Sequence, residues 1–568
     1  MSGTVSGTGD AFNLDNLRSA SPRTAVERRE LGQWFTAAPV ARLAIAAAGL
    51  SGSRTRVLDP MCGDGAFLAA AREAGFTALT GVEIDADAAE RAAAIPGAAI
   101  TGGDALASGL VQQLGTFDLV IGNPPYVQAG RIDPGVRRAR ATAIAEDWPE
   151  LSRDVVNMIA RHGDVAATCL LRALRFVRPG GTLALVVSTA LLDADAASAL
   201  WSAVERVASV RALIIAPGER WFADAAVNPM LLVARRHDGA SVAHAPRLLR
   251  LTAPTEVAAR VPGLDAIAAH ADERRADSPA GWGAALRAPA AWFAWRAAAG
   301  DAVVPLRELA EVRRGLTTGA NHVFYLRRDA AKRERLEPAY LAPVVRSPFN
   351  GAPAPIAIAP DESPLVAIAL PHDAKLARTP RIAAWLRAHE AEALASSAAR
   401  RDPWWSLPAN PARLFLAKAY GPRFVQRLAD VPMLADQRVY ALLPRPGVDL
   451  VGLAAVLNAL PTAVALESLG RGSMGYGAVE WTVADALELP VLDVRRADAR
   501  TLAALATALA AFARRPVEHV RLERDHADRA ALDRIATALA PGADLAPDLW
   551  TALLASVALR DRYLLPSV

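Results

Sequence analysis

An alternation of strand-like and helix-like segments between residues 55 and 235 limits the fold of this chain most strongly. Short apolar runs are separated by alanine-rich or amphipathic stretches with helical periodicity, such as 65–74 and 162–177. Strands and helices in this order form a parallel sheet covered by helices. The predicted strands are TRVLDP (55–60), ALTGVEID (78–85), FDLVIGN (117–123), TLALVVS (182–188) and VRALIIA (210–216).

A further strand, VNPMLLVAR (227–235), follows 210–216 without room for a crossover helix. We therefore expect it to run antiparallel to its predecessor, because a parallel connection needs a dozen or more residues. The fold class predicted for this part is α/β, with a mostly parallel sheet and an antiparallel last strand.

The chain has 568 residues, which exceeds what a single hydrophobic core supports. Residues 238 to about 300 are rich in Ala, Pro and Arg, and beyond 301 the patterns become mixed, with turn clusters and aromatic residues. We predict a frayed terminus (1–30), the α/β domain (31–240), a linker with short helices (241–300), an α+β domain (301–495) and a helical C-terminal region (496–568).

Composition excludes several classes of protein. No apolar stretch reaches the roughly 18 residues of a membrane span, and the first thirty residues lack the apolar segment of a signal peptide. Two cysteines, Cys62 and Cys169, argue against a disulfide scaffold or a cysteine-ligated metal site. We therefore expect a cytoplasmic protein with no metal and no membrane partner. The net charge of +4 permits a polyanionic partner.

The segment VLDPMCGDGAFL (57–68) has the order strand, glycine loop, helix. Gly63 and Gly65 would let the backbone approach a ligand, and the helix N-terminus adds partial positive charge. Glu83 ends the next strand, where a carboxylate can accept hydrogen bonds from ribose hydroxyls. Asp104 follows the third strand, in ITGGDAL, where an adenine amino group could be bound.

Three interpretations of this pocket compete. A nicotinamide or flavin nucleotide calls for a third glycine where Leu68 stands, and Asp59 and Asp64 would repel a pyrophosphate. A tight turn in an ordinary α/β sheet is the second interpretation. S-adenosylmethionine, which combines ribose and adenine with a cationic, zwitterionic tail, fits the acidic strand ends best.

The fourth strand ends in Asn-Pro-Pro-Tyr, at the sheet edge where open α/β sheets bind ligands. The Asn123 side-chain oxygen and the Pro124 carbonyl are two acceptors held side by side, which suits an NH2 group. Such acceptors help to localise the lone pair of a base amine as it attacks. Tyr126 offers a flat surface for stacking. A strand-ending turn with a half-buried tyrosine is the alternative.

Taken together, these motifs carry a resemblance to a known family, which is strong over about 31 to 235. The chain resembles the gamma-class N6-adenine DNA methyltransferases, and in particular the Taq-type enzymes of restriction–modification systems. The resemblance implies a Rossmann-like methyltransferase fold with S-adenosylmethionine as methyl donor. The motifs, in order, are FTAAPVA (35–41), DPMCGDG (59–65), VEID (82–85), GD (103–104) and NPPY (123–126).

The resemblance also implies a role for each matching residue. Thr36 would contact the methionine end of the cofactor and Asp59 would lie beside it. Glu83 would hold the ribose and Asp104 the adenine. The residues at the target base would be Asn123 and Pro124 on the amine, Tyr126 stacked on the flipped base, and Phe222 packed against it, with Trp221 as its rival. Ala37 departs from the family, which usually has proline there.

Duplex DNA is the expected substrate and partner. A base must leave the stack to react, at a cost of a few kcal/mol, and stacking on Tyr126 and Phe222 would recover roughly 1–3 kcal/mol each. The segment GRIDPGVRRARA (130–141) is a candidate phosphate-binding arm, with a solvated basic loop as the equal alternative. Its arginines are Arg131, Arg137, Arg138 and Arg140.

The C-terminal half weakly resembles the target-recognition domain of Taq-type enzymes. The similar stretches are 311–326, 418–424 and 469–491. Residues 401–430 hold five Arg or Lys against two Asp or Glu. The candidate DNA contacts are Lys418, Arg423, Arg471 and Tyr476. A nuclease motif is not recognisable at either end, so any restriction endonuclease would be a separate partner.

Three other functions remain open at the level of sequence. Asn-Pro-Pro-Tyr also occurs in methyltransferases that act on protein glutamine amides, although the long C-terminal half counts against this function. Methylation of RNA bases is less firmly excluded. A DNA-binding subunit with an inactive methyltransferase site is the third, and the complete set of site residues argues against it.

Overall fold

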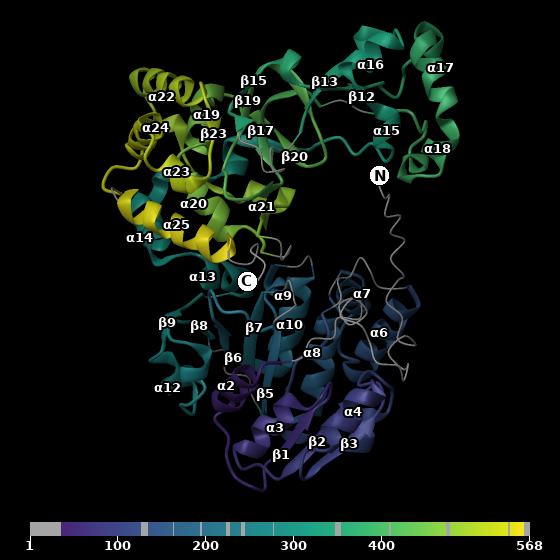
Figure 1. Cartoon of the computed structure of the whole chain (residues 1–568), viewed down its shortest axis with the longest axis vertical. Helices are drawn as coiled ribbons and strands as arrows, with labels where there is room; N and C mark the ends of the chain where they lie inside the picture. The colour runs from purple at the N-terminus through teal and green to yellow at the C-terminus, as the bar shows by residue number, and fades with distance from the viewer. Residues whose placement is uncertain are drawn as a thin grey trace, which may run out of the picture. The chain divides into compact units, whose positions relative to one another are not determined.

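The computed structural model divides into two compact units, Met1–Arg287 and Ala288–Val568, which are described separately (Figure 1). The segment predicted to be frayed, 1–30, lies outside the described residues. The structure describes residues 36–126, 134–162, 164–193, 196–222, 228–239, 245–276, 278–346, 354–407, 410–472, 477–543 and 546–561.

The first unit is built on a nine-stranded sheet with the order β3-β2-β1-β4-β5-β7-β6-β8-β9. It is parallel from β3 to β5, and β7 runs antiparallel to β5 and β6, which confirms the predicted fold class. The strands are β1 (Arg56–Asp59), β2 (Ala78–Glu83), β3 (Ala98–Gly102), β4 (Phe117–Gly122), β5 (Val177–Ser188), β6 (Ala208–Ile215), β7 (Pro229–Arg236), β8 (Arg247–Leu251) and β9 (Ala271–Arg274).

Helices cover both faces of this sheet, so its inner strands are buried on both sides. In β5, Leu183 and Leu185 face one hydrophobic cluster, whereas Ala184 and Val186 face the other. This explains why the strands are continuous apolar runs in the sequence. The helices of the unit are α2 (Ala38–Ala48), α3 (Ala66–Glu73), α4 (Ala86–Ala93), α5 (Leu110–Leu114), α6 (Pro134–Asp147), α7 (Arg153–His162), α8 (Val165–Phe176), α9 (Ala190–Asp193), α10 (Ala197–Val207), α11 (Thr255–Ala258), α12 (Leu264–Ala268) and α13 (Pro279–Arg287).

The segment 241–300, predicted as a linker, is different in the structure. Strands β8 and β9 extend the first sheet, and the first unit ends at Arg287 rather than at residue 240. The arginines that suggested a linker are neutralised locally: Arg247 pairs with Asp265 and Glu273. Arginine-rich composition therefore concealed two strands at the edge of the sheet.

The second unit contains an eight-stranded sheet with the order β11-β20-β17-β19-β13-β16-β12, in which β15 pairs with β19. Its α+β character agrees with the predicted fold class. The strands are β11 (Ala310–Arg314), β12 (Tyr325–Arg327), β13 (Leu341–Val345), β15 (Ala357–Ile358), β16 (Leu365–Ile368), β17 (Ala412–Ala417), β19 (Arg427–Ala435) and β20 (Val439–Pro444).

Smaller strand pairs link distant parts of this unit. These are β10 (Val303–Pro305) with β22 (Pro490–Leu492), β14 (Ala354–Pro355) with β23 (Pro516–Val517), and β18 (Ala419–Tyr420) with β21 (Val479–Glu480). The longer helices are α14 (Ala290–Ala299), α17 (Pro380–Ala388), α19 (Leu450–Leu457), α20 (Leu460–Leu469), α22 (Ala499–Phe512), α24 (Ala527–Thr537) and α25 (Ala546–Asp561), and the shorter ones are α15 (Asn321–Phe324), α16 (Arg328–Arg333), α18 (Glu390–Leu394), α21 (Val483–Leu487) and α23 (Val520–Glu523).

The C-terminal region from 496 is helical, but it is not a separate layer. Residues of α22, α24 and α25 share one hydrophobic cluster with α14, α19, α20 and the strands β11, β17 and β20. In addition, β23 pairs with β14. The second unit therefore includes both the predicted α+β domain and the predicted tail.

Among the described residues, no single helix is long and apolar enough to cross a membrane. The helices α19 and α20 together have the length and apolar composition of a membrane span, but they are bent by 59° relative to each other. Both helices are buried in the core of the second unit.

A buried ion pair tests whether the tail is part of the second core. Arg529 is 2% exposed between the rings of Phe512 and Trp550, and its Nε donates to both oxygens of Asp533, at 3.0 and 2.9 Å. Asp533 also accepts from the backbone N–H of Leu460 in α20, at 2.7 Å.

We expect Asp533→Ala to lower the free energy of unfolding of the second unit by about 3–5 kcal/mol, because it leaves a buried cation unpaired. Hydrogen exchange of peptides from α20, α22 and α25, followed by mass spectrometry over a urea series, measures this. The exposed Asp525 gives the control, Asp525→Ala, which should change little. Equal effects of the two variants would contradict the assigned packing.

Candidate active site

Four neighbouring parallel strands bring their polar ends to one edge of the first sheet. Strand β1 ends in Asp59 and pairs with β2 on one side and β4 on the other. Glu83 ends β2, opposite Gly102 of β3, and Asn123 directly follows β4. The carboxyl ends of parallel strands are where open α/β sheets bind ligands. The predicted residues Asp59, Glu83 and Asn123 are thus brought to one edge.

Asp59 is completely buried and only half satisfied. Its Oδ1 accepts from the backbone N–H of Met61 at 3.1 Å, whereas Oδ2 has no hydrogen-bond partner among the described residues. Burial, together with the nearby carboxylates of Glu83 and Asp64, raises the pKa of Asp59 to about 8. An unsatisfied buried carboxylate oxygen is costly, so it marks a place prepared for a donor, and best for a cationic one.

Gly122, the last residue of β4, lies directly against this carboxylate. It has a φ of +148°, and a Cβ at this position would lie 2.6 Å from Asp59 Oδ1. Only glycine allows the two strand ends to approach so closely. The close approach sets Asn123, the next residue, beside the buried acid.

Glu83 is held in a fixed orientation by two backbone donors. Its Oε2 accepts from the N–H of Gly63 at 2.7 Å and its Oε1 from the N–H of Asp85 at 2.8 Å. Burial raises the pKa of Glu83. An ionised carboxylate has about four acceptor positions, so each oxygen keeps capacity for a ligand hydroxyl. The bond to Gly63 also ties the glycine loop to the end of β2.

The two glycines of this loop have different tasks. Gly63 has a φ of +55°, and a Cβ there would meet nothing within 4 Å, so the loop borders open space. Gly65 has a φ of +91°, and its Cβ would lie 2.4 Å from Ile95 Cδ1 and 3.2 Å from Ala92. Gly63 therefore suits a ligand-facing position, whereas Gly65 is required by the packing of α3.

Asp104 follows β3 at the same edge and is half-buried. Its Oδ1 accepts from the N–H of Leu106 at 2.8 Å, and the N–H of the preceding Gly103 donates to the carbonyl of Glu83 at 2.8 Å. This second contact joins the β2 and β3 ends. A carboxylate fixed in this way can accept from an amino group of a ligand.

Apolar side chains that the sequence analysis did not single out lie beside these acids. Met61, Ile84 and Leu106 are partly exposed and pack on the buried Val165 and Cys169 of α8. An apolar wall next to fixed acceptors is typical of sites for a planar heterocycle with polar edges. The signal in the sequence is an apolar residue one or two positions after each acidic strand end.

The Asn123 amide is held from both sides. Its Nδ2 donates to Thr36 Oγ1 at 3.2 Å, and its Oδ1 accepts from the hydroxyl of Tyr126 at 2.5 Å. The same hydroxyl lies 3.0 Å from the carbonyl oxygen of Val186. Burial raises the pKa of Tyr126 well above its usual value. An amide oxygen has two lone pairs and can accept up to two hydrogen bonds.

Phe222 meets Tyr126 as an edge-to-face pair, with ring centroids 5.9 Å apart and planes at 64°. Its rival, Trp221, is 3% exposed, and its Nε1 donates to Thr255 Oγ1 at 3.0 Å. Phe222 is itself 4% exposed, so burial does not separate the two residues. The bond to Thr255 gives Trp221 a structural role, and the contact with Tyr126 assigns Phe222 to the Asn123 site.

Only some arginine side chains of the basic segment after the Asn-Pro-Pro-Tyr motif are exposed enough to contact phosphate groups. Arg137 and Arg138 lie on α6, half-buried and exposed respectively. Arg140, in contrast, is 1% exposed and donates to Thr168 Oγ1 at 2.9 Å and to the carbonyl of Asp164 at 2.7 Å. Arg140 was wrongly included among the phosphate contacts, because it links α6 to α8. Arg131 lies outside the described residues.

Of the candidate DNA contacts in the second unit, some have half-exposed side chains and one is held in an ion pair. Lys418 lies between β17 and β18, and Arg423 between β18 and β19, both with half-exposed side chains. Arg471 makes a two-point ion pair with Asp485, from Nε at 2.7 Å and from Nη2 at 3.0 Å, so we assign it a structural role instead. Tyr476 lies outside the described residues.

A sheet of this topology with these strand ends defines the class of Rossmann-like methyltransferase folds. Residues 21–241 match the sequence model of the family described as N-6 DNA Methylase. The match covers the α/β sheet of the first unit up to the residues just after β7.

Two further comparisons give the relatives of the chain. A Type II methyltransferase of Thermus thermophilus is 31% identical over 154 residues, which are 27% of this chain and 33% of that protein. The match thus spans about a third of the relative's length. The solved structure of the Type IIL restriction-modification enzyme MmeI in complex with DNA has a TM-score of 0.54 at 13% identity, and the match covers 93% of this chain and 71% of that one. This second likeness concerns the fold alone.

The contact between Gly122 and Asp59 gives a test of the site geometry. We expect Gly122→Ala to destabilise the first unit by about 1–3 kcal/mol, because the added methyl overlaps the buried carboxylate. The matched control is Gly102→Ala at the end of β3, where a Cβ meets nothing within 4 Å.

Thiol labelling over a urea series reports on this unit alone, since the two cysteines of the chain, Cys62 and Cys169, are both buried in it. A Gly122→Ala protein as stable as the Gly102→Ala protein would contradict the close approach.

Proposed function

We propose that this chain is a site-specific DNA methyltransferase that transfers a methyl group from S-adenosylmethionine to N6 of adenine in duplex DNA. The observation that carries the proposal is the Asn123 amide, fixed between Thr36 and Tyr126 and set beside the buried acid Asp59. One edge of the sheet therefore holds both an acceptor for an amine, Asn123, and a buried carboxyl group, Asp59, that a cation would stabilise. The match of residues 21–241 to the sequence model of the N-6 DNA Methylase family supports the same proposal.

The residues of the first unit fit S-adenosylmethionine. The Oδ2 of Asp59, which has no hydrogen-bond partner in the described part of the chain, suits the cationic methionine end, and Thr36 is bonded to the neighbouring Asn123. The doubly held carboxylate of Glu83 suits ribose hydroxyls. Asp104, with the apolar wall of Ile84 and Leu106, suits adenine. When bound, this cofactor would supply an electrophilic methyl group.

In this proposal the protein's own groups activate the amine. The side-chain oxygen of Asn123 and the carbonyl of Pro124 would accept the two amino protons of adenine. The amine nitrogen gains positive charge as it attacks, and acceptors that are already oriented stabilise that charge without reorganisation. The raised pKa of Tyr126 keeps its phenol neutral, so we assign the tyrosine to positioning and stacking rather than to proton removal.

The target adenine would have to leave the helix to reach this edge. Flipping costs a few kcal/mol, and stacking on aromatic side chains returns roughly 1–3 kcal/mol per contact. Tyr126 and Phe222 form the aromatic pair next to Asn123 and are our candidates for this role. Phosphate contacts would come from Arg137 and Arg138 in the first unit and from Lys418 and Arg423 in the second.

The biological role that we infer is the modification activity of a restriction–modification or related defence system. One relative named above is a Type II methyltransferase and the other a restriction-modification enzyme. A separate restriction endonuclease would then be the partner.

Asn123→Ala tests the proposed chemistry. We expect methyl transfer to fall by at least about a hundredfold, as when one preorganised polar group is removed from an active site, with cofactor affinity nearly unchanged. The control is Asn157→Ala, which removes an exposed amide from α7 of the same unit.

Each protein is expressed in a methylation-deficient host, and its DNA is read by long-read modification sequencing. A single motif carrying N6-methyladenine with the wild type and with Asn157→Ala, but not with Asn123→Ala, supports the proposal. Label from the methyl donor appearing in RNA or in a protein amide, with unmodified DNA, would overturn it.

The pKa of Asp59 predicts a pH dependence of cofactor binding. The pKa of about 8 means that the free protein holds this carboxyl protonated at pH 7, whereas a bound cation lowers the pKa and favours the ionised form. Binding should therefore release a proton, and affinity should rise with pH, by up to about tenfold per unit, until pH reaches about 8.

Isothermal titration of S-adenosylmethionine between pH 6 and pH 9, in buffers of different ionisation enthalpy, measures the dissociation constant and the protons released. The ligand's own amino group titrates near pH 8, so Asp59→Asn is the necessary comparison. We expect this variant to bind more weakly and to lose the rise. Identical pH profiles for both proteins would remove Asp59 from the cationic end.

A further inference from the structure

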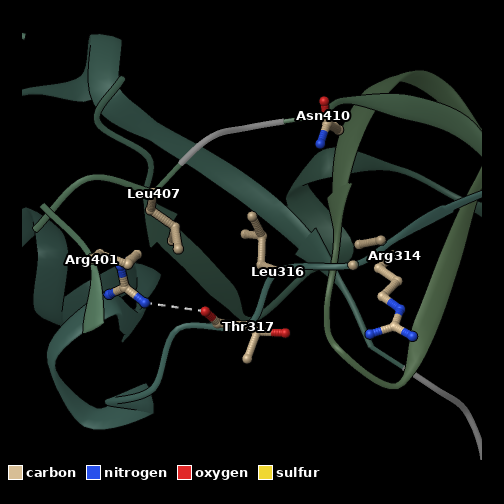
Figure 2. A pocket seen from close by; sticks show the side chains of 8 residues that line it. Arg314, Leu316, Thr317, Arg401, Leu407 and Asn410 are labelled. Atoms are coloured by element: carbon tan, nitrogen blue, oxygen red, sulfur yellow. Dashed lines mark hydrogen bonds between the residues drawn. The ribbon is translucent and has the colours of Figure 1, made fainter. Parts of the chain in front are cut away.

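The second unit contains a cavity of about 240 Å³ that none of the functional residues above explains. It opens where β11 ends and lies beside the last residue of β19. Figure 2 shows its lining, which comes from segments far apart in the sequence. The lining residues are Arg314, Gly315, Leu316, Thr317, Arg401, Leu407, Asn410 and Ala435.

The loop that forms one wall is fixed at both ends. A Cβ at Gly315 would lie 2.0 Å from the carbonyl oxygen of Asp436, and one at Gly319 would lie 2.4 Å from the backbone N of Ala398. Between them, the N–H of Leu316 donates to the carbonyl of Ala435 at 2.7 Å. The loop is thus pressed against β19 on one side and against the short helix Ser397–Arg400 on the other. The cavity is therefore preformed.

Arg401 is locked in the opposite wall. Its Nη1 donates to the carbonyl of Thr317 at 3.3 Å (Figure 2). Its Nε donates to the carbonyl of Trp404 at 3.1 Å, and its guanidinium lies 5.1 Å from the centre of the Phe324 ring. None of these contacts supplies a counterion for its charge. Holding a half-buried arginine in place without an acid is costly unless an anion binds there.

The charge of the cavity is uniformly positive. Among the described residues, neither Arg314 nor Arg401 forms an ion pair, and no Asp or Glu lines the cavity. The contrast with Arg313 is sharp, because that neighbour pairs with Glu311 through Nε at 2.8 Å. The half-buried guanidinium of Arg401 and the exposed guanidinium of Arg314 favour a ligand with phosphate groups, which arginine binds through paired N–H donors.

The order of cationic and apolar side chains along the cavity further restricts which ligands fit. In Figure 2, Arg401 and Arg314 lie on opposite sides of Leu316 and Thr317, and Leu407 and Asn410 lie along the same cavity. Apolar side chains therefore separate the two cations. A nucleic-acid strand has the matching order of phosphate, sugar with base, and phosphate, whereas a single inorganic phosphate matches one side only.

We propose that this cavity binds the backbone of one DNA strand, with phosphates of that strand at Arg314 and at Arg401 and the sugar between them. The inference rests on the proposed function, since it takes DNA as the substrate. The volume is below the roughly 300–1,000 Å³ typical of sites that enclose a whole drug-sized ligand, which agrees with partial enclosure of a strand.

The salt dependence of DNA affinity tests the proposal in the full chain. Each phosphate contact adds about 0.9 to the slope of log affinity against log salt concentration on duplex DNA. We expect Arg314→Gln and Arg401→Gln each to lower the slope by about 0.9. Arg313→Gln, which removes the same charge from the adjacent, paired residue, should leave the slope unchanged. Binding is measured by fluorescence anisotropy with a duplex that contains the methylated motif.

Arg401 packs on Phe324, so its variant could also loosen the fold. Thr317 avoids this difficulty because its side chain is exposed. Thr317→Glu places an anion at the cavity, and Thr317→Gln has nearly the same shape without the charge. We expect Thr317→Glu to bind DNA roughly fivefold more weakly than Thr317→Gln, as for two like charges about 4 Å apart in water.

Ethylation of single phosphates locates the contacts. The wild type should be inhibited by ethylation at two nearby phosphates of one strand, and each arginine variant should lose sensitivity to a different one of them. Unchanged slopes in both arginine variants, with equal binding by the two Thr317 variants, would overturn the cavity proposal and leave the proposed function intact. If the wild-type chain neither binds nor methylates DNA, both fail.

Discussion

The site depends on one buried carboxyl group, Asp59, that the described part of the fold does not satisfy. The sheet order places β1 between β2 and β4, so Asp59 has the Glu83 strand on one side and the Asn123 strand on the other. Burying a carboxylate without a donor on each oxygen disfavours its ionised form. Burial therefore raises the pKa of Asp59 to about 8. A cation bound here would offset part of this cost, so the strand edge is a favourable position for a positively charged group.

The neighbouring acids show that burial alone does not define the role of a carboxylate. Glu83 is nearly as buried as Asp59, yet two backbone N–H groups hold it. Glu83 is thus a fixed acceptor for hydroxyl groups, whereas Asp59 Oδ2 has no donor among the described residues. Asn123 is held in the same way, by Thr36 and Tyr126. One edge therefore offers an acid with an unsatisfied oxygen, an acid held by two backbone N–H groups and an oriented amide, and the two acids differ mainly in the donors that surround them.

Much of this edge could be predicted, because polar residues after apolar runs mark the ends of buried strands. Asp59, Glu83 and Asn123 could be placed from the sequence for that reason. The wall formed by Ile84 and Leu106 could not, since an apolar residue after a strand looks like ordinary core. Strands β8 and β9 were missed because their arginines, such as Arg247, find acidic partners through tertiary contacts. The separate tasks of Gly63 and Gly65 required knowledge of what a Cβ would touch.

The roles of the arginines likewise depend on tertiary contacts that the sequence does not reveal. Composition suggested that Arg140 and Arg471 would face DNA, but Arg140 bonds within its own unit and Arg471 is fixed by Asp485. Neither fact can be read from a sequence, because pairing depends on which acid the fold brings near. Adjacent residues show this most directly: Arg313 has Glu311 as its counterion, whereas Arg314 has none in the part of the chain that the structure describes. Arg314 is exposed and hydrated, so the stronger indication of an external anion is the half-buried Arg401, which is fixed by two carbonyl groups and the Phe324 ring without an acid.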